Sequence, residues 1–180
     1  MTTKALFNQE LLTHVSIGLL ADLVLKNGLL LATAESCTGG MIAAACTDLA
    51  GSSAWFERGF VTYSNAAKTE MLGVDAALIA QHGAVSEPVA RAMAFGAIRH
   101  SNAQVSVAVT GVAGPAGGSV DKPVGTVWFA WSVCGILCSE IMFFSGDRAT
   151  VREATVQHAV ARLLTLTKKK LPWQVGAKTP

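Results

Sequence analysis

The segment that decides the fold is LLLATAESCTGGMIAAACTDLA, residues 29–50. Its apolar run LLLATA (29–34) is typical of a buried strand, ESCTGG (35–40) is a turn of small residues, and MIAAACTDLA (41–50) is typical of a helix. A strand, a turn and a helix in this order often bind an anion, because N–H groups at the helix start point outward and the dipole favours negative charge. We therefore predict an α/β protein with a candidate anion site at this turn.

Further strands and helices are predicted on both sides of this segment. Helices are expected over 8–27, 65–73 and 86–100 and after 145–148 to about Lys168, and strands over 58–64, 103–110, 124–133 and 136–144. Cys134-Gly135 suits a tight hairpin between the last two strands. Alternation followed by a hairpin predicts a three-layer α/β/α sandwich with a mixed, mostly parallel sheet. We expect one domain over residues 1–180, with a flexible tail over 171–180.

The composition limits the class of protein. The chain has 180 residues, of which 51% are hydrophobic and 14% charged, as in a globular domain and unlike a disordered chain. The mean hydropathy is positive, at +0.43, yet no apolar run reaches the roughly 18 residues that a membrane-spanning helix needs. The first ten residues, MTTKALFNQE, contain no apolar signal-peptide core. We therefore expect a cytoplasmic protein that does not bind a membrane.

Neither a nucleic acid nor a metal is indicated as a partner. The net charge is only +2, and the one basic cluster, 168–170, lies at the end of a predicted helix, where it suits the helix dipole. The cysteines form no CxxC pair and the histidines are scattered, so we expect no zinc site. From the apolar composition we expect a homo-oligomer.

Three turns share a composition of small residues. They are SCTGG (36–40), TGVAGPAGG (110–118) and SGDR (145–148), and each follows a predicted strand. Because ligands of open α/β sheets bind at the carboxyl ends of strands, the turns could meet at one pocket for a phosphate or a carboxylate. Arg148 favours such a pocket, since a cation in the first turn of a helix opposes the dipole and is easier to explain beside an anion. A solvated surface arginine remains the alternative.

The stretch GSSAWFERGFVTYSNAAK, residues 51–68, could place Ser53, Tyr63 and Lys68 around one reacting atom. A serine nucleophile needs a base, and Lys68 could serve if burial or a neighbouring cation lowers its pKa. Tyr63, the only tyrosine of the chain, could relay a proton from the end of a strand. The alternative is a tyrosine at a strand end and a lysine on a helix surface, with no catalytic role.

Six segments together resemble one known family. They are AESCTGG (34–40), AGSSAWFERGFVTYSNAAK (50–68), LIAQHGAVSEPVA (78–90), VTGVAGPAGG (109–118), KPVGTVWFA (122–130) and FFSGDR (143–148). Over roughly residues 10–167 the chain is similar to the C-terminal domain of the competence-damage-inducible protein CinA, whose stand-alone members are nicotinamide-nucleotide amidohydrolases. The resemblance implies hydrolysis of the carboxamide of nicotinamide mononucleotide (NMN) to nicotinate mononucleotide and ammonia, in pyridine-nucleotide salvage, without a metal or redox cofactor.

The resemblance also implies roles for particular residues. It assigns the nucleophile to Ser53, with Lys68 as the base, Tyr63 assisting, and N–H groups near Gly51–Ser53 holding the oxyanion. The substrate-binding residues implied by the same motifs are Ser36, Thr38, Gly39, Thr110, Gly111, Gly114 and Arg148. Ser52 remains a rival nucleophile. Two other interpretations stay open: a nucleotide-binding or interaction module without activity, and a metal-dependent hydrolase, which EDTA would inhibit.

Overall fold

The elements of the chain follow the predicted order closely. The computed structural model describes residues 3–171, in which β1 (Leu31–Glu35), a turn and α2 (Met41–Thr47) confirm the prediction for the opening segment. The remaining helices are α1 (Thr3–Lys26), α3 (Asn65–Leu72), α4 (Ala76–His82), α5 (Glu87–Arg99) and α6 (Arg148–Lys170), with the short 3-10 helix η1 (Ser52–Ala54). The remaining strands are β2 (Phe56–Val61), β3 (Val105–Gly111), β4 (Thr126–Val133) and β5 (Ile136–Phe143).

The strands form one mixed sheet in the order β2-β1-β3-β4-β5. β1 pairs in parallel with β2 and β3, whereas β4 is antiparallel to both β3 and β5. The predicted mixed sheet is confirmed, and its parallel pairing is confined to β2, β1 and β3. Because β5 runs in the same direction as β3, the segment after β5 emerges at the same edge as the segments after the three parallel strands.

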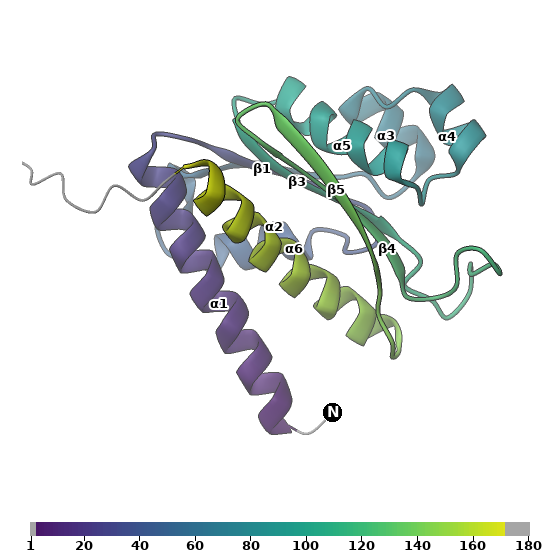
Figure 1. Cartoon of the computed structure of the whole chain (residues 1–180), viewed down its shortest axis with the longest axis horizontal. Coiled ribbons are helices and arrows are strands. Elements are labelled where there is room, and N and C mark those ends of the chain that lie inside the picture. The colour runs from purple at the N-terminus through teal and green to yellow at the C-terminus, as the bar shows by residue number, and fades with distance from the viewer. Residues whose placement is uncertain (1–2, 172–180) are drawn as a thin grey trace, which may run out of the picture.

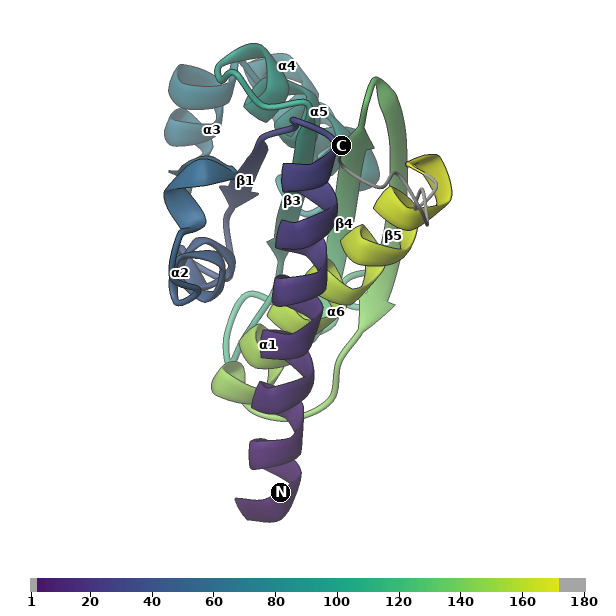
Figure 2. The same ribbon diagram turned by 90° about the vertical axis from the view of Figure 1, so that its left-hand side faces the viewer.

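Helices cover both faces of the sheet, which confirms the three-layer α/β/α architecture. α1, α2 and α6 cover one face of the sheet, and α3, α4 and α5 cover the other (Figure 1). The buried side chains of each group of helices form a hydrophobic cluster on its face. Strand alternation supplies both, since Val107 of β3 belongs to the first cluster and the neighbouring Ala108 to the second. Figure 2 shows α1 crossing in front of α6, and the two helices are in contact.

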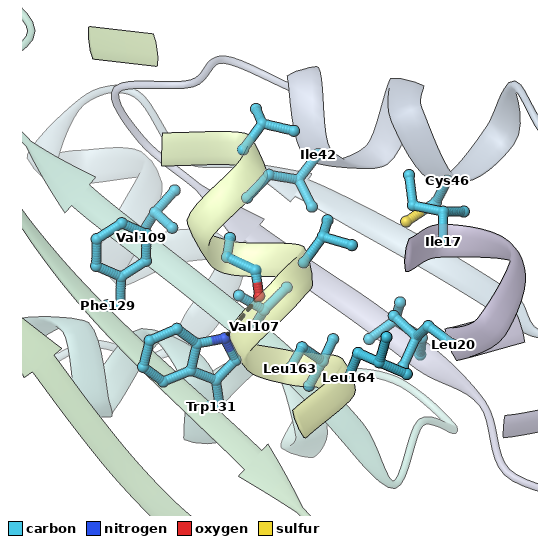
Figure 3. Packing of buried hydrophobic residues seen from close by; sticks show 14 of the residues in the cluster. Ile17, Leu20, Ile42, Cys46, Val107, Val109, Phe129, Trp131, Leu163 and Leu164 are labelled. Carbon is cyan, nitrogen blue, oxygen red and sulfur yellow. Dashed lines mark hydrogen bonds between the residues drawn. The ribbon is translucent and has the colours of Figure 1, made fainter. Parts of the chain in front are cut away.

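One core lies between the sheet and the layer of α1, α2 and α6 (Figure 3). The rings of Phe129 and Trp131 stack there with centroids 5.5 Å apart. The indole Nε1 of Trp131 donates to the carbonyl of Ala159 in α6 at 3.1 Å, so this large side chain is buried with its polar atom satisfied. The contact holds α6 against β4.

The opposite face of the sheet carries small side chains that allow α5 to approach closely. The buried alanines of this face are Ala32, Ala34, Ala108 and Ala130. Helix α5 also approaches α3 closely. A Cβ added at Gly96 of α5 would lie only 2.2 Å from the carbonyl oxygen of Leu72 at the end of α3. The position of α3 therefore depends on a backbone-to-helix contact that only glycine permits.

Local differences from the sequence prediction have simple causes. The hairpin is confirmed, with Cys134 and Gly135 at φ values of 47° and 82°, as a type I′ turn requires. Helix α4 and η1 escaped prediction because seven and three residues are too few to establish a helical period. Except for Leu171, the tail predicted to be flexible lies outside the described residues. Among the helices described in 3–171, none has the length and apolar character needed to cross a bilayer.

Replacing Gly96 with alanine should destabilise the fold, because the added Cβ would overlap the Leu72 carbonyl and push α5 away from α3. We expect the free energy of unfolding in urea to fall by about 1–3 kcal/mol, the usual cost of overpacking. Gly18→Ala in α1 is the matched control, since nothing lies within 4 Å of its added Cβ. Equal effects of the two substitutions would contradict this account.

Candidate active site

The turns after β2, β3 and β5 converge at one edge of the sheet. The guanidinium of Arg148, the first residue of α6, joins them: Nη1 donates to the carbonyl of Gly114 at 2.9 Å, and Nη2 donates to the hydroxyl of Tyr63 at 3.0 Å. Of the three small-residue turns predicted to meet, 110–118 and 145–148 are joined by Arg148, whereas Tyr63 comes from a segment outside that prediction. Arg148 is exposed, but its guanidinium is held at this edge by hydrogen bonds to two oxygen atoms.

Lys68 of α3 is buried at the same edge, with 1% of its surface exposed. Its Nζ donates to Ser36 Oγ at 3.0 Å. It also donates to the backbone carbonyls of Thr62, at 2.8 Å, and Tyr63, at 3.4 Å. None of the ion pairs found within residues 3–171 involves Lys68. Burial therefore lowers the pKa of Lys68 below its ordinary value of 10.5.

The oxygen atoms around Lys68 suit a neutral amine. A neutral amine offers two N–H bonds and one lone pair, and the carbonyls of Thr62 and Tyr63 can only accept hydrogen bonds. When these carbonyls take the two N–H bonds, the lone pair faces the remaining neighbour, the hydroxyl of Ser36. In this form Ser36 donates its proton toward Nζ, which is the geometry of a serine nucleophile with its base.

Ser36 lies in a strand–turn–helix corner. It directly follows β1, and its N–H donates to the carbonyl of Val109 in β3 at 3.1 Å. Gly39 and Gly40 complete the turn with φ values of 62° and 98°, a left-handed conformation that glycine adopts without strain. The corner therefore holds the Ser36 hydroxyl at the carboxyl end of the sheet, against Lys68.

The carboxylate of Glu35 fills the start of α2 from inside the protein. Oε2 accepts hydrogen bonds from Thr38 Oγ1 (2.7 Å) and from the N–H groups of Gly40 and Ile42 (3.0 Å each), and Oε1 accepts from the N–H of Ala43 (2.8 Å). Glu35 is fully buried. This corrects the prediction of an anion site at the turn of residues 35–40, because the protein's own carboxylate already occupies the helix N-terminus.

Ser53 lies at the opposite end of β2 from Tyr63 and Lys68. It is exposed in η1, which precedes β2, whereas Tyr63 and Lys68 follow that strand. The six residues of β2 separate its ends by about 20 Å, at roughly 3.3 Å per residue. Within one chain the structure therefore brings neither Ser53 nor the adjacent Ser52 to Lys68, and the serine that contacts Lys68 is Ser36.

The other residues implied by the resemblance have clear structural roles. The buried hydroxyl of Thr110 donates to the carbonyl of Ala84 at 2.9 Å, and that of Thr38 donates to Glu35. Added Cβ atoms at Gly111 and Gly114 would lie 2.8 Å from Thr126 O and 2.5 Å from Val124 Cγ1. Close packing thus explains both glycines, while the Gly114 carbonyl also accepts from Arg148. Gly39 serves the turn described above.

Sequence reasoning missed two charged residues of this corner, Glu35 and Arg152. Glu35 is the last residue of β1, where alternation gives no sign that its side chain turns toward the following helix. Arg152 donates to the carbonyls of Cys37 and Thr38 from the second turn of α6. Its spacing of four residues from Arg148 was the available signal, since residues i and i+4 share a helix face.

The thiols near the site are protonated at neutral pH. Burial raises the pKa of Cys37 to about 11 and that of Cys46 to about 12. In the described part of the chain, no three His, Cys, Asp or Glu side chains gather in a way that could hold a metal ion.

Comparisons with known proteins agree on one family. A family model described as the CinA C-terminal domain matches residues 16–167. The protein of Escherichia coli (strain K12) named nicotinamide-nucleotide amidohydrolase PncC is 55% identical over 139 residues, which cover 76% of this chain and 83% of that protein. The protein of the same name from Enterobacter agglomerans is 50% identical over 163 residues, which cover 90% of this chain and 97% of the relative.

Solved structures agree with this fold over most of the chain. The competence damage-inducible protein A (ComA) from Klebsiella pneumoniae aligns with a TM-score of 0.83 at 41% identity, over 90% of this chain and 99% of that one. The competence/damage inducible protein CihA from Agrobacterium tumefaciens aligns with a TM-score of 0.81 at 46% identity, over 88% and 94% of the two chains.

Glu35→Gln should destabilise the corner that carries Ser36, because an amide of the same shape turns an N–H₂ group toward at least one donor that the carboxylate now satisfies. We expect a loss of about 2–4 kcal/mol in the free energy of unfolding, measured with urea. Glu57→Gln is the control, since its carboxylate pairs with the exposed Arg58, where water screens the interaction. A loss no larger than that of the control would refute the structural role of Glu35.

Proposed function

Because this chain belongs to the CinA C-terminal domain family, we propose that it hydrolyses the carboxamide of NMN, releasing nicotinate mononucleotide and ammonia. The names of relatives at 50–58% identity, nicotinamide-nucleotide amidohydrolase PncC, support the reaction and its place in pyridine-nucleotide salvage. The observation that carries the mechanism is the buried contact of 3.0 Å between Lys68 Nζ and Ser36 Oγ.

Ser36 is the nucleophile in this proposal, in place of Ser53. It is the serine in contact with a buried amine of lowered pKa, whereas Ser53 is exposed at the far end of β2. A hydroxyl attacks an amide only when a base removes its proton, so the proximity of the base favours Ser36. This assignment uses the same residues as the family resemblance, but it gives Ser36 the role that the resemblance gives to Ser53.

The reaction proceeds through an acyl-enzyme. Ser36 Oγ attacks the carboxamide carbon while its proton passes to Lys68 Nζ, and the carbonyl electrons move onto the oxygen. Lys68 then returns the proton to the nitrogen, the C–N bond breaks and ammonia leaves, with the nicotinoyl group esterified to Ser36. A water molecule next attacks the ester with its proton going to Lys68, and the carboxylate product departs as Ser36 recovers its proton.

The backbone after Ser36 supplies a donor for the oxyanion. The N–H of Thr38 has no hydrogen-bond acceptor among the described residues. It lies two residues beyond the nucleophile, in the turn that Glu35 makes rigid. An aligned donor at this point typically lowers the barrier by about 2.7–4 kcal/mol.

Arg148 and Tyr63 bind the rest of the nucleotide in this proposal. Arg148 is the candidate partner of the 5′-phosphate, since Glu35 occupies the alternative anion site at the start of α2. The hydroxyl of Tyr63 accepts from Arg148, so its own hydrogen remains available to the substrate or to the proton transfer. Tyr63 is 62% exposed, and the face of an exposed aromatic ring attracts a cationic pyridinium.

Ser36→Ala should lower kcat for ammonia release from NMN by about 10⁴-fold or more, as expected when a nucleophile is removed. Ser53→Ala is the matched control and should retain kcat within about twofold, because an exposed side chain remote from Lys68 makes no transition-state contact. Both variants are assayed beside the unmodified protein, with EDTA present.

The opposite pattern, with activity lost only in Ser53→Ala, would reject Ser36 as the nucleophile. Inhibition of the unmodified protein by EDTA would support a metal-dependent hydrolase. A folded protein that binds NMN without releasing ammonia would support a nucleotide-binding module.

The activity should rise with pH, because only the neutral form of Lys68 can accept the proton of Ser36. Burial lowers the pKa of Lys68, so kcat/KM should increase up to that pKa and level off below the ordinary value of 10.5. Lys68→Arg, which stays protonated, should be inactive throughout the range from about pH 6 to pH 9. A kcat/KM that falls with rising pH would contradict the role of Lys68 as a base.

A further inference from the structure

Arg152, a residue of α6, forms hydrogen bonds to the turn that contains Ser36. Its Nε donates to the carbonyl of Cys37 at 3.1 Å, and its Nη2 donates to the carbonyl of Thr38 at 2.7 Å. The guanidinium is partly buried, and none of the ion pairs within residues 3–171 involves it. A cation thus binds two consecutive peptide carbonyls directly after the proposed nucleophile.

We propose that Arg152 is a positioning residue that sets the Ser36 turn and strengthens its oxyanion donor. The inference rests on the proposed serine mechanism. Arg152 touches neither Ser36 Oγ nor Lys68 Nζ, so it acts through the backbone and is distinct from Arg148, which binds Tyr63 one helical turn earlier.

The peptide that joins Cys37 to Thr38 transmits the effect. Its carbonyl accepts from Arg152, and its N–H is the donor of Thr38 that has no acceptor in the described part of the chain. A cation bound to a peptide oxygen draws electrons from the N–H, so the hydrogen bond to a developing oxyanion becomes stronger. The same charge lies near the turn's thiol, since Arg152 is among the charges that lower the pKa of Cys37 against the larger effect of burial.

Two residues of opposite charge bind this turn from opposite sides, Glu35 and Arg152. Glu35 binds Thr38 and the N–H groups of the helix start from inside the core, while Arg152 binds the carbonyls from α6. Glu35 therefore fixes the corner itself, and Arg152 fixes the tilt of the peptide planes on which the N–H of Thr38 depends. A planar fork with several donors suits two neighbouring carbonyls, which a lysine ammonium cannot reproduce.

The test compares Arg152→Gln and Arg152→Lys with Arg162→Gln, a control on the same helix whose arginine pairs with Glu140 away from the site. Two rates are measured on folded protein: ammonia release from NMN, and phosphonylation of Ser36 by a fluorophosphonate, located by mass spectrometry. In the second reaction the Ser36 O–P bond forms, the P–F bond breaks, fluoride leaves and the proton passes to Lys68. This reaction needs no NMN, so it reports the state of Ser36 independently of the natural substrate.

We expect Arg152→Gln to lower both kcat and the Ser36 labelling rate by about tenfold or more, with KM within about twofold of the unmodified value. The rates of Arg152→Lys should fall between those of the unmodified protein and Arg152→Gln, because lysine keeps the charge and loses the planar guanidinium. Arg162→Gln should match the unmodified protein. If Arg152→Gln does not fold, a smaller but parallel loss of both rates in Arg152→Lys, relative to Arg162→Gln, carries the test.

Three results would overturn the inference: rates in both Arg152 variants equal to those of Arg162→Gln, a rise in KM with unchanged kcat, or no labelling of Ser36 in the unmodified protein. Failure of the proposed function looks different. Unmodified protein that is labelled at Ser36 but releases no ammonia from NMN would count against the substrate, and the labelling rates of the variants would still decide the role of Arg152.

Discussion

The site depends on the hydrogen bonds that the carboxylate of Glu35 accepts at the start of α2. At the end of β1 the chain must turn sharply into α2, which leaves the first N–H groups of the helix without partners inside the protein. Glu35 satisfies three of them and the hydroxyl of Thr38. Charge-assisted hydrogen bonds are the strong ones, so the corner is rigid without an external ligand. Ser36 is the next residue, so its backbone is held in place as well.

The buried amine of Lys68 is the complementary constraint. A lysine enclosed by protein with no ion-pair partner among the described residues loses stability relative to its hydrated form, and this loss is what lowers its pKa. Its hydrogen bonds to Thr62 and Tyr63 fix the direction of the remaining lone pair. The tight contact of Gly96 with Leu72 places α3, and with it Lys68, against the corner of Ser36. Packing far from Ser36 thus aligns the amine that we propose as the base.

Strand direction explains why the functional groups share one edge. β1, β2 and β3 are parallel, and the hairpin of β4 and β5 returns the chain so that α6 also begins there. One turn of α6 then presents Arg148 to Tyr63 and Gly114, and the next presents Arg152 to the Ser36 turn. The core contact of Trp131 with Ala159 holds this helix in register with the sheet. In the proposed mechanism, neighbouring turns of this one helix therefore carry the residue that binds the substrate and the residue that positions the nucleophile.

The sequence by itself determined the α/β class, the order of the longer elements, the hairpin at Cys134-Gly135 and the family, because these follow from short-range periodicity, turn chemistry and long ordered motifs. It also identified Lys68, Tyr63, Arg148 and Ser36 as residues of interest. Only the tertiary structure decided which serine meets the lysine. Ser53 is closer to Lys68 along the chain, but the extended strand β2 carries the two apart, while parallel pairing of β1 with β2 brings Ser36 to Lys68 across 32 positions of sequence. Only the tertiary structure, likewise, revealed that the apparent anion site is filled by Glu35, since a side chain's direction at a strand end depends on the helix that packs beside it.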